Sequence, residues 1–236
     1  MWDRFAQRSY ELEHLDLGDY TPEEYEGCMA ELRLINLCFG EARALWRTFW
    51  RDAMRAGVKD FSVLDVGAGS GELLRQIAGW QQDSGCSGRL LGVELNEQAA
   101  RAIGEKSAGC PVIEALRSDA LRLPLKDSTF DYAICSLFTH HFVEEQVVTI
   151  LREMARVARR GIYVIDLHRH PLPYYVYTRL GPLVLRNRLT RDDGALSILR
   201  GFVPKELAAL ARQAGLDGVK VERVFPYRLV LSGRKK

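Results

Sequence analysis

Hydrophobic and polar positions follow two alternating patterns through the middle of the chain. Short apolar runs rich in branched residues are separated by segments with the spacing of amphipathic helices. The runs are apolar nearly throughout, which is typical of strands covered on both faces. Strands that alternate with helices predict a parallel sheet with helices on both sides. The strands are predicted at Ser62–Val66, Arg89–Glu94, Pro111–Ala115, Phe130–Ser136 and Gly161–Asp166, and the helices at Glu72–Trp80, Glu97–Lys106 and Glu144–Ala158.

The C-terminal part of the chain adds one helix and two strands. Residues Pro204–Gly215 open with Pro and close on Gly, as helices often do. The strand-like runs Val219–Val224 and Tyr227–Ser232 flank Phe225-Pro226, and their short connection predicts an antiparallel hairpin. We therefore expect an α/β fold: a Rossmann-like, doubly wound, mostly parallel seven-stranded sheet with an antiparallel C-terminal hairpin and a helical N-terminal cap.

Two regions lie outside this alternation. Residues 1–57 are expected to form two helices, the first starting at Thr21-Pro22-Glu23-Glu24 and the second near Asn36–Ala56. Residues 167–203 follow the fifth strand and are rich in tyrosine and arginine. We expect a cap of residues 1–57 and a main domain of residues 58–236 with a lid insertion at about 167–203, both lying over the strand ends.

Composition and charge narrow the function classes. The 236 residues are 47% hydrophobic and 27% charged, as in ordinary globular proteins. With 33 basic and 31 acidic side chains the net charge is +2, and no basic stripe of the kind that binds nucleic acid is evident. We expect no nucleic-acid partner.

The same survey bears on the compartment. The chain starts with charged residues rather than an apolar signal segment, and no window of about 18 apolar residues could span a membrane. The five cysteines are widely spaced and match neither a zinc set nor a redox pair, which indicates reduced thiols. We expect a cytoplasmic protein without stable membrane insertion, either a monomer or a homodimer.

A glycine-rich turn between a strand and a helix is the most informative segment. It reads Val63-Leu64-Asp65-Val66-Gly67-Ala68-Gly69-Ser70-Gly71-Glu72 and lies where ligands bind in open parallel sheets, beyond the carboxyl ends of the strands. A phosphate-binding nucleotide loop needs Lys followed by Ser or Thr after its last glycine, but Glu72-Leu73 follows here. A dinucleotide loop has the spacing G-x-G-x-x-G, whereas the third glycine here, Gly71, comes one position early.

Two carboxylates make this turn mildly anionic. Glu72 in the first helical turn would repel a pyrophosphate, although it suits the helix dipole. Asp65 adds a second negative charge. The turn therefore suits a ligand with an ammonium and a sulfonium group better than a ligand with two phosphates, which disfavours a nicotinamide oxidoreductase.

The segment resembles the first motif of class I S-adenosylmethionine-dependent methyltransferases. Three further stretches match in the same order, so that the resemblance covers about residues 60–166. They are Leu91-Gly92-Val93-Glu94-Leu95, Ser118-Asp119-Ala120 with Leu123-Pro124-Leu125, and Phe130-Asp131-Tyr132-Ala133-Ile134-Cys135-Ser136. The resemblance implies S-adenosylmethionine as the cofactor and residues 58–236 as the methyltransferase domain.

The resemblance also implies roles for individual residues. Glu94 would accept hydrogen bonds from both ribose hydroxyls, Asp119 would hold the adenine amino group, and Ser136 would lie beside the methionine portion. Taken singly, Glu94 could be an ordinary exposed carboxylate and Asp119 could cap a turn. The expected cofactor-binding residues are Asp65, Gly67, Ala68, Gly69, Gly71, Glu94, Leu95, Asp119, Ala120, Ser136 and Leu137.

Two histidines after the fourth strand are the candidate catalytic residues. Methyl transfer depends mostly on holding the nucleophile close and aligned, and a base is needed only if the accepting atom loses a proton. Histidine, whose unperturbed pKa is about 6.5, suits proton removal from a phenol, which makes His140 and His141 the candidates. The alternative is that they fix the loop by hydrogen bonding. No metal-binding set is evident, so we expect metal-independent transfer.

Within the family, the chain most resembles the small-molecule branch related to the quinone-pathway methyltransferases. The supporting stretches are Leu151–Val157, Phe202–Leu207 and Ala214-Gly215-Leu216. This implies O- or C-methylation of a small acceptor, often aromatic, polyketide-like or isoprenoid, as in secondary metabolism. The lid agrees, because apolar and aromatic side chains suit such a ligand. Its six arginines could hold a carboxylate or a carrier phosphate, or could simply be solvated, and an amphipathic lid could touch a membrane.

Two alternative functions stay open. An RNA or protein methyltransferase would keep the cofactor but change the acceptor; the stretch Ser136-Leu137-Phe138-Thr139 lacks the Asn/Asp-Pro-Pro-aromatic motif of many amino-group methylating relatives. A non-catalytic partner would keep the cofactor-binding fold for binding or regulation, without turnover. Loss of cofactor binding in the purified protein would favour that second alternative.

Overall fold

The computed structural model describes residues 3–38 and 40–235 and contains one seven-stranded sheet. The strand order is β3-β2-β1-β4-β5-β7-β6; β1 to β5 run parallel, and β7 is antiparallel to both β5 and β6. The strands are β1 Val63–Val66, β2 Leu90–Glu94, β3 Ile113–Arg117, β4 Phe130–Ser136, β5 Ala158–Leu167, β6 Leu216–Val224 and β7 Arg228–Lys235. The predicted doubly wound sheet with an antiparallel C-terminal hairpin is confirmed.

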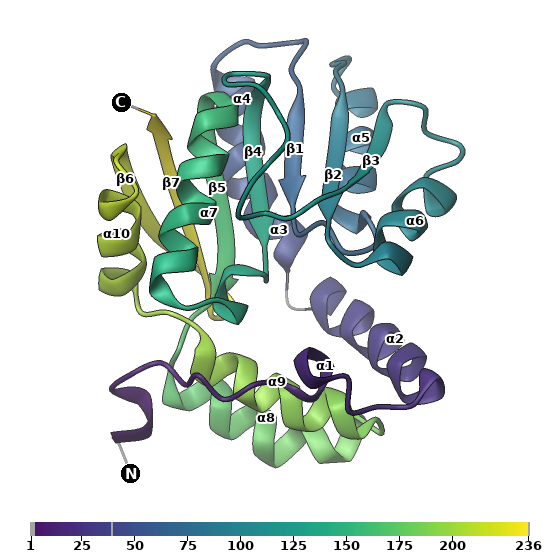
Figure 1. Ribbon diagram of the computed structural model, residues 1–236, viewed down its shortest axis with the longest axis vertical. Coiled ribbons are helices and arrows are strands. Elements are labelled where there is room, and N and C mark those ends of the chain that lie inside the picture. The colour runs from purple at the N-terminus through teal and green to yellow at the C-terminus, as the bar shows by residue number, and fades with distance from the viewer. Residues whose placement is uncertain (1–2, 39, 236) are drawn as a thin grey trace.

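Helices cover both faces of the sheet and bury its apolar side chains (Figure 1). One face packs on α3, α4, α5 and α6 around fully buried residues such as Phe49, Phe61 and Leu74. The other face packs on α7 and α10 around Phe130 and Ile150. The helices are α3 Glu41–Leu45, the π-helical turn η2 Trp46–Trp50, α4 Arg51–Arg55, α5 Glu72–Asp83, α6 Glu97–Lys106, the short turn η3 Thr139–His141, α7 Glu144–Val157 and α10 Pro204–Gln213.

A second layer of helices lies below the carboxyl ends of the parallel strands (Figure 1). It contains η1 Asp3–Phe5, α1 His14–Leu17, α2 Pro22–Cys38, α8 Pro171–Val184 and α9 Arg188–Arg200. Asp193 of α9 accepts hydrogen bonds from the backbone N–H groups of His14 and Leu15, and Asn187 donates to the carbonyl oxygen of Glu24 at 2.7 Å. The N-terminal segment and the insertion after β5, far apart in the sequence, therefore form one layer.

Residues 41–55 pack differently from the rest of the N-terminal region. Ala44, Phe49 and Trp50 are buried in the sheet core, whereas α2 lies in the second layer. The predicted helix near Asn36–Ala56 is split, because residues 36–38 end α2, Phe39 lies outside the described residues, and Gly40 has a left-handed φ of 73° before α3. The cap of residues 1–57 stays a prediction, and this packing favours a boundary near residue 40.

The structure bears on the cysteines and on membrane-spanning helices. Cys28, Cys86, Cys110 and Cys135 are free thiols, and the side chain of Cys38 lies outside the described part. In residues 3–38 and 40–235, no helix combines the length and the apolar character needed to cross a membrane.

Candidate active site

The glycine-rich turn joins β1 to α5 at the sheet edge that faces the second layer. The backbone N–H groups of Gly67 and Ala68 donate to the carbonyl oxygen of Val93 at 2.9 and 3.1 Å, which holds the turn against β2. Gly67 has a φ of 72°, and a Cβ there would lie 2.5 Å from the Phe138 ring, so a larger residue would clash. Gly69 has a φ of 52°, and no described atom lies within 4 Å of its Cβ position. The turn therefore presents bare backbone to open space.

Glu94 ends β2 beside this turn. Its Oε2 accepts a hydrogen bond from the N–H of Gly69 at 3.0 Å, and its Oε1 accepts from the N–H groups of Leu95 and Asn96 at 2.9 and 3.1 Å. Because a carboxylate oxygen has two lone pairs, Oε2 can still accept a hydrogen bond from a ligand hydroxyl. Glu94 thus has one acceptor position left for a ribose hydroxyl, and the second hydroxyl of the implied pair would have to replace one of these backbone donors.

Asp65 carries a buried carboxyl group in β1. It is 2% exposed, and its Oδ1 makes no hydrogen bond within the described residues. Burial first, and then the nearby Glu41 and Glu94, raise the pKa of Asp65 well above its usual range. A ligand ammonium group would supply both the missing hydrogen bond and the missing positive charge. The site therefore fits the amino group and sulfonium of S-adenosylmethionine.

Gly71 and Glu72 begin α5. Gly71, with a φ of 76°, donates its N–H to the carbonyl oxygen of Ala68 at 2.9 Å. Glu72 forms an ion pair with Arg75 at 2.8 Å, so its charge is partly compensated on the helix surface. Because burial also disfavours the charged form of Asp65, the turn of the ligand-free protein is less anionic than the sequence alone suggests.

The other expected cofactor residues lie along the same sheet edge. Asp119 and Ala120 follow β3; Asp119 is exposed, and its Oδ1 accepts the backbone N–H two residues on, as a turn cap does. Leu95 is 61% exposed beyond β2. Ser136 ends β4, and Leu137 after it has a φ of 49°, which is strained for a residue with a side chain. The fold brings these residues to one edge; their contacts with the cofactor stay a prediction.

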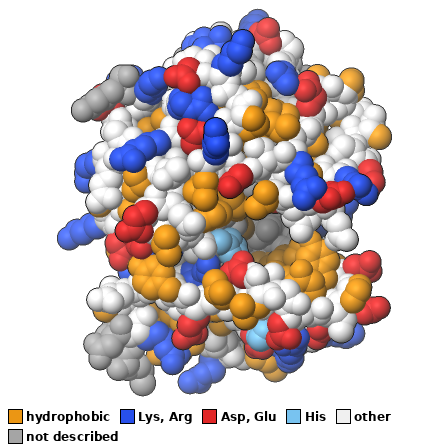
Figure 2. All heavy atoms as spheres, in the orientation of Figure 1, with side chains coloured by type: hydrophobic (Ala, Val, Ile, Leu, Met, Phe, Trp, Pro, Cys, Tyr) orange, Lys and Arg blue, Asp and Glu red, His pale blue; other side chains and the backbone are white. Residues whose placement is uncertain are grey.

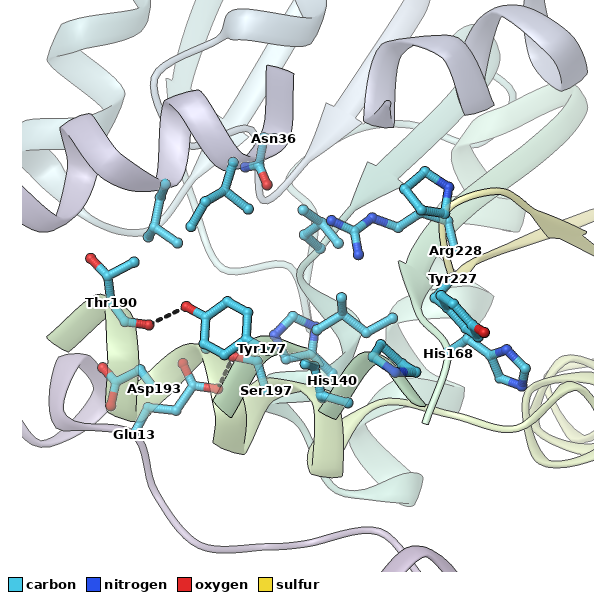
Figure 3. Close-up of a pocket in the computed structure, with 18 of the residues that line it drawn as sticks. Glu13, Asn36, His140, His168, Tyr177, Thr190, Asp193, Ser197, Tyr227 and Arg228 are labelled. Atoms are coloured by element: carbon cyan, nitrogen blue, oxygen red, sulfur yellow. Dashed lines mark hydrogen bonds between the residues drawn. The ribbon is translucent and has the colours of Figure 1, made fainter. Parts of the chain in front are cut away.

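A cavity of about 400 Å³ lies between the strand ends and the second layer. Hydrophobic side chains surround a hollow between the two layers in Figure 2, and Figure 3 shows side chains pointing into this cavity. Its wall is mostly apolar, which suits a small hydrophobic or aromatic ligand. Apolar side chains in the wall include Leu32, Ile35, Leu167, Val176 and Ile198.

His140 lines this cavity and is held by Asp166 of β5. The two side chains are almost fully buried, and Nδ1 of His140 lies 2.6 Å from Oδ1 of Asp166. Burial alone would raise the pKa of Asp166, but the ion pair with His140 and hydrogen bonds from His140 and Thr139 hold it at about 2. Asp166 is therefore a carboxylate that accepts the Nδ1 proton. The other ring nitrogen of His140, Nε2, is not used in this contact and can accept a proton.

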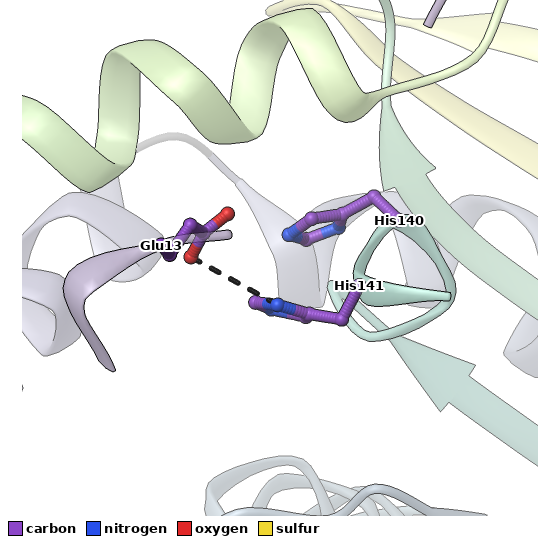
Figure 4. A group of neighbouring side chains, drawn as sticks. All are labelled: Glu13, His140 and His141. Carbon is purple, nitrogen blue, oxygen red and sulfur yellow. Dashed lines mark ion pairs between the residues drawn. The ribbon is translucent and has the colours of Figure 1, made fainter. Parts of the chain in front are cut away.

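His141 lies beside His140, with the two rings tilted to each other, and faces Glu13 (Figure 4). Its buried Nδ1 makes no hydrogen bond and lies 3.4 Å from Asp16 and 3.9 Å from Glu13. Burial raises the pKa of Glu13, whose Oε1 accepts a hydrogen bond from Ser197 at 2.7 Å. Ligand atoms of Glu13, His140 and His141 lie within 4.8 Å of one another, a spacing that a metal ion could use.

Two buried arginines hold the histidine loop from its backbone side. Arg8 donates to the carbonyl oxygen of His140 at 3.1 Å, and Arg200 donates to those of His140 and His141 at 3.2 and 2.7 Å. Arg200 also pairs with Asp16 at 2.7 Å. The loop is therefore fixed by one arginine from the N-terminal segment and one from α9.

Other lid arginines also bond inside the protein. Arg169 is buried and forms an ion pair with Glu206, and Arg188 pairs with Glu24 at 3.2 Å. These contacts favour a structural role over the acceptor-binding role considered from the sequence. The arginine in the cavity wall is instead Arg228, at the start of β7.

Sequence reasoning did not identify four residues of this site: Glu13, Glu41, Asp166 and Arg228. Asp166 ends a predicted strand next to the strand that precedes the histidines, so its place in the pattern could have revealed it. The sequence has no comparable signal for the other three, because their neighbours are far away along the chain.

The sequence of this chain is similar to those of known methyltransferases. Residues 64–165 match the model of a family described as a methyltransferase domain. The chain is 36% identical to the demethylmenaquinone methyltransferase of Roseiflexus sp. (strain RS-1), over 71% of this chain and 70% of that protein. It is also 36% identical to the demethylmenaquinone methyltransferase of Roseiflexus castenholzii, over 78% and 77% of the two chains.

Solved structures show the same fold at low sequence identity. A S-adenosylmethionine-dependent methyltransferase from Aquifex aeolicus has a TM-score of 0.55 at 19% identity, covering 78% of this chain and 87% of that chain. The magnesium protoporphyrin IX methyltransferase of Synechocystis PCC 6803 with bound S-adenosylhomocysteine has a TM-score of 0.58 at 15% identity, covering 83% and 84%. At these identities the likeness concerns the fold.

Proposed function

Because the chain belongs to the class I S-adenosylmethionine-dependent methyltransferases, in the branch related to quinone-pathway enzymes, we propose that it methylates a small hydrophobic or aromatic acceptor bound in the cavity. The observation that carries this proposal is that the candidate cofactor site and the apolar cavity lie next to each other. The glycine-rich turn and Glu94 lie at the carboxyl end of the sheet, and the apolar cavity with His140 adjoins that edge. A quinone-like acceptor is the class that the Roseiflexus relatives favour.

The cofactor would be held by the residues of the sheet edge. Glu94 would accept hydrogen bonds from the ribose hydroxyls, and Asp65 would face the amino group. The backbone at Gly69 would allow close approach, because no side chain projects there. When bound, S-adenosylmethionine supplies a methyl group activated by its sulfonium.

The residues of the cavity would position the acceptor and accept its proton. Apolar walls exclude water and align the acceptor, which is the main task in such a displacement. Asp166 fixes the His140 ring with the proton on Nδ1, so Nε2 can take a proton from an acceptor hydroxyl. His141, beside His140, completes this end of the cavity.

We further propose that the protein acts in the cytoplasm, on a small molecule rather than a nucleic acid, and without a metal ion. Calorimetric titration with S-adenosylmethionine, with NADH and ATP as controls, tests the cofactor assignment. We expect saturable binding of S-adenosylmethionine alone, followed by methylation of phenols or quinone precursors in a screen. Absence of binding would favour a non-catalytic protein and reject the proposal.

A further inference from the structure

Arg228 is a buried arginine in the cavity wall. It opens β7, where its register partner is Leu167 at the end of β5, and it is 6% exposed. Figure 3 shows its side chain beside Tyr227 and His168 in the same close-up as His140. The guanidinium therefore belongs to the part of the cavity next to β5 and β7, which holds the acceptor in the proposed function.

Within the described part of the chain, the guanidinium of Arg228 contacts no counter-charge. Its Nε is buried without a hydrogen bond, and among residues 3–38 and 40–235 no carboxylate lies within ion-pair distance of it. The nearest acidic groups, Glu41 and Asp166, act on it only through space, and Asp166 is already bonded to His140. Burial accordingly lowers the pKa of Arg228.

Other buried arginines of the protein behave differently. Arg8 and Arg200 each bond to backbone carbonyl oxygens and to a carboxylate, and Arg169 pairs with Glu206. A buried charge without a partner is costly, so a protein that keeps one has a counter-ion available in its working state. For Arg228 the open side is the cavity, and the counter-ion is therefore a bound ligand.

Two ligands could bring an anionic oxygen to this place. The first is the methyl acceptor, and the second is the α-carboxylate of the cofactor. The sheet order favours the acceptor, because β7 is separated from β1 and β2, which carry the glycine-rich turn and Glu94, by β4 and β5. The apolar residues Leu137 and Leu167 and the imidazole of His168 also line the cavity. None of these three side chains carries the fixed positive charge that Arg228 offers to an anionic group in this part of the cavity.

We propose that Arg228 binds an anionic oxygen of the methyl acceptor, either a carboxylate or an ionised enol or phenol. This inference rests on the proposed function and narrows its substrate class to acidic acceptors. The planar guanidinium suits such groups because it offers five N–H donors in a fixed geometry and keeps its charge when buried. Arg228 is thus a specificity-determining residue and exchanges no proton with the acceptor.

The test uses a matched pair of aromatic probes. Binding of 1-hydroxy-2-naphthoate and of its uncharged methyl ester is measured by calorimetry on the full chain saturated with S-adenosylhomocysteine. We expect the wild type to bind the carboxylate about tenfold more tightly than the ester, and Arg228→Gln to abolish this preference. Arg228→Lys should retain part of it. Arg234→Gln, an exposed position of the same strand, serves as the control and should change neither affinity.

Each other outcome has a definite meaning. A tenfold loss of S-adenosylmethionine affinity in Arg228→Gln, with carboxylate binding unchanged, would assign the guanidinium to the cofactor and overturn the proposal. A wild type that binds the cofactor but shows no preference for the carboxylate would also overturn it. A wild type that binds no cofactor would instead reject the proposed function.

Thermal unfolding of the ligand-free proteins separates binding from structure. Because Arg228→Gln removes an unpaired buried charge, we expect its melting temperature to equal or exceed that of the wild type. A clear drop in Arg228→Gln together with a normal Arg228→Lys would mean that the positive charge stabilises the fold without a ligand, and the proposal would fall.

Discussion

Nδ1 of His140 and Oδ1 of Asp166 lie 2.6 Å apart, in a contact between the loop after β4 and the end of β5. The carboxylate also accepts the backbone N–H of His140 at 3.1 Å, so it fixes both the ring and the main chain of the same residue. This arrangement sets the tautomer of His140 and aims Nε2 away from Asp166. The pair therefore links the strand order of the sheet to the orientation of a histidine that lines the cavity.

Replacing either member of this pair should lower turnover more than cofactor affinity. His140→Ala and His141→Ala should reduce kcat, with His140→Ala losing about a hundredfold or more if it removes a base. Asp166→Asn should act through His140 and shift the pH profile of kcat. His14→Gln, a histidine of the second layer with an exposed partner, is the control. Unchanged turnover in both histidine variants would reject the base hypothesis.

A side chain at Gly69 should block the cofactor while leaving the fold. The φ of 52° disfavours valine, and its Cβ would project into the open space beside Glu94. We expect Gly69→Val to weaken S-adenosylmethionine binding about tenfold or more in calorimetry. Gly79→Ala, inside α5 with free space around its Cβ, should bind normally and gain about 0.5–1 kcal/mol of stability. Tight binding by Gly69→Val would mean that the site lies elsewhere.

His168 should contribute stability that rises with pH between about 4 and 6.5. Burial first, and then the charges of Arg223, His170 and Arg169, lower the pKa of His168 from 6.5 to about 4. In this window the unfolded chain binds a proton that the folded chain excludes, so the free energy of unfolding falls as the pH falls. The effect is at most about 3 kcal/mol.

Urea unfolding at pH 4.5 and pH 7 measures this effect when the wild type is compared with His168→Gln. We expect the variant to show a smaller difference between the two pH values. Asp16 and Asp166 have pKa values of about 2 and so contribute below this window. The raised pKa values of Glu13 and Asp65 act in the opposite sense, but they are common to both proteins and cancel in the comparison. An equal pH dependence in both proteins would contradict the prediction.

Turnover should not depend on a metal ion, even though Glu13, His140 and His141 come together. Arg8 and Arg200 place positive charge behind this group, and His140 already has a carboxylate partner. We therefore expect unchanged turnover after dialysis against EDTA and no gain from added Zn²⁺ or Co²⁺. Loss of activity that is restored by the metal in the wild type, but not in Glu13→Gln, would show that these residues hold a metal.

Much of the candidate site could be predicted because its residues belong to short patterns in the sequence. The glycine-rich turn needs Gly67 and Gly69 at fixed places between a strand and a helix, and Glu94 follows the next strand at the same edge. The alternation of strands and helices then determines that these segments meet, because parallel strands share one carboxyl edge. The two histidines after β4 belong to the same edge for the same reason.

The sequence by itself thus determined the fold class and placed the glycine-rich turn and the two histidines at one sheet edge, since each depends on residues close together in the chain. Only the tertiary structure decided what surrounds them. Glu13 comes to His141 because the N-terminal segment packs on α9, and Arg228 enters the cavity because β7 inserts beside β5. Whether a carboxylate or a guanidinium is paired, buried or free depends on contacts between residues far apart in the chain. No regular pattern in the sequence reveals such contacts.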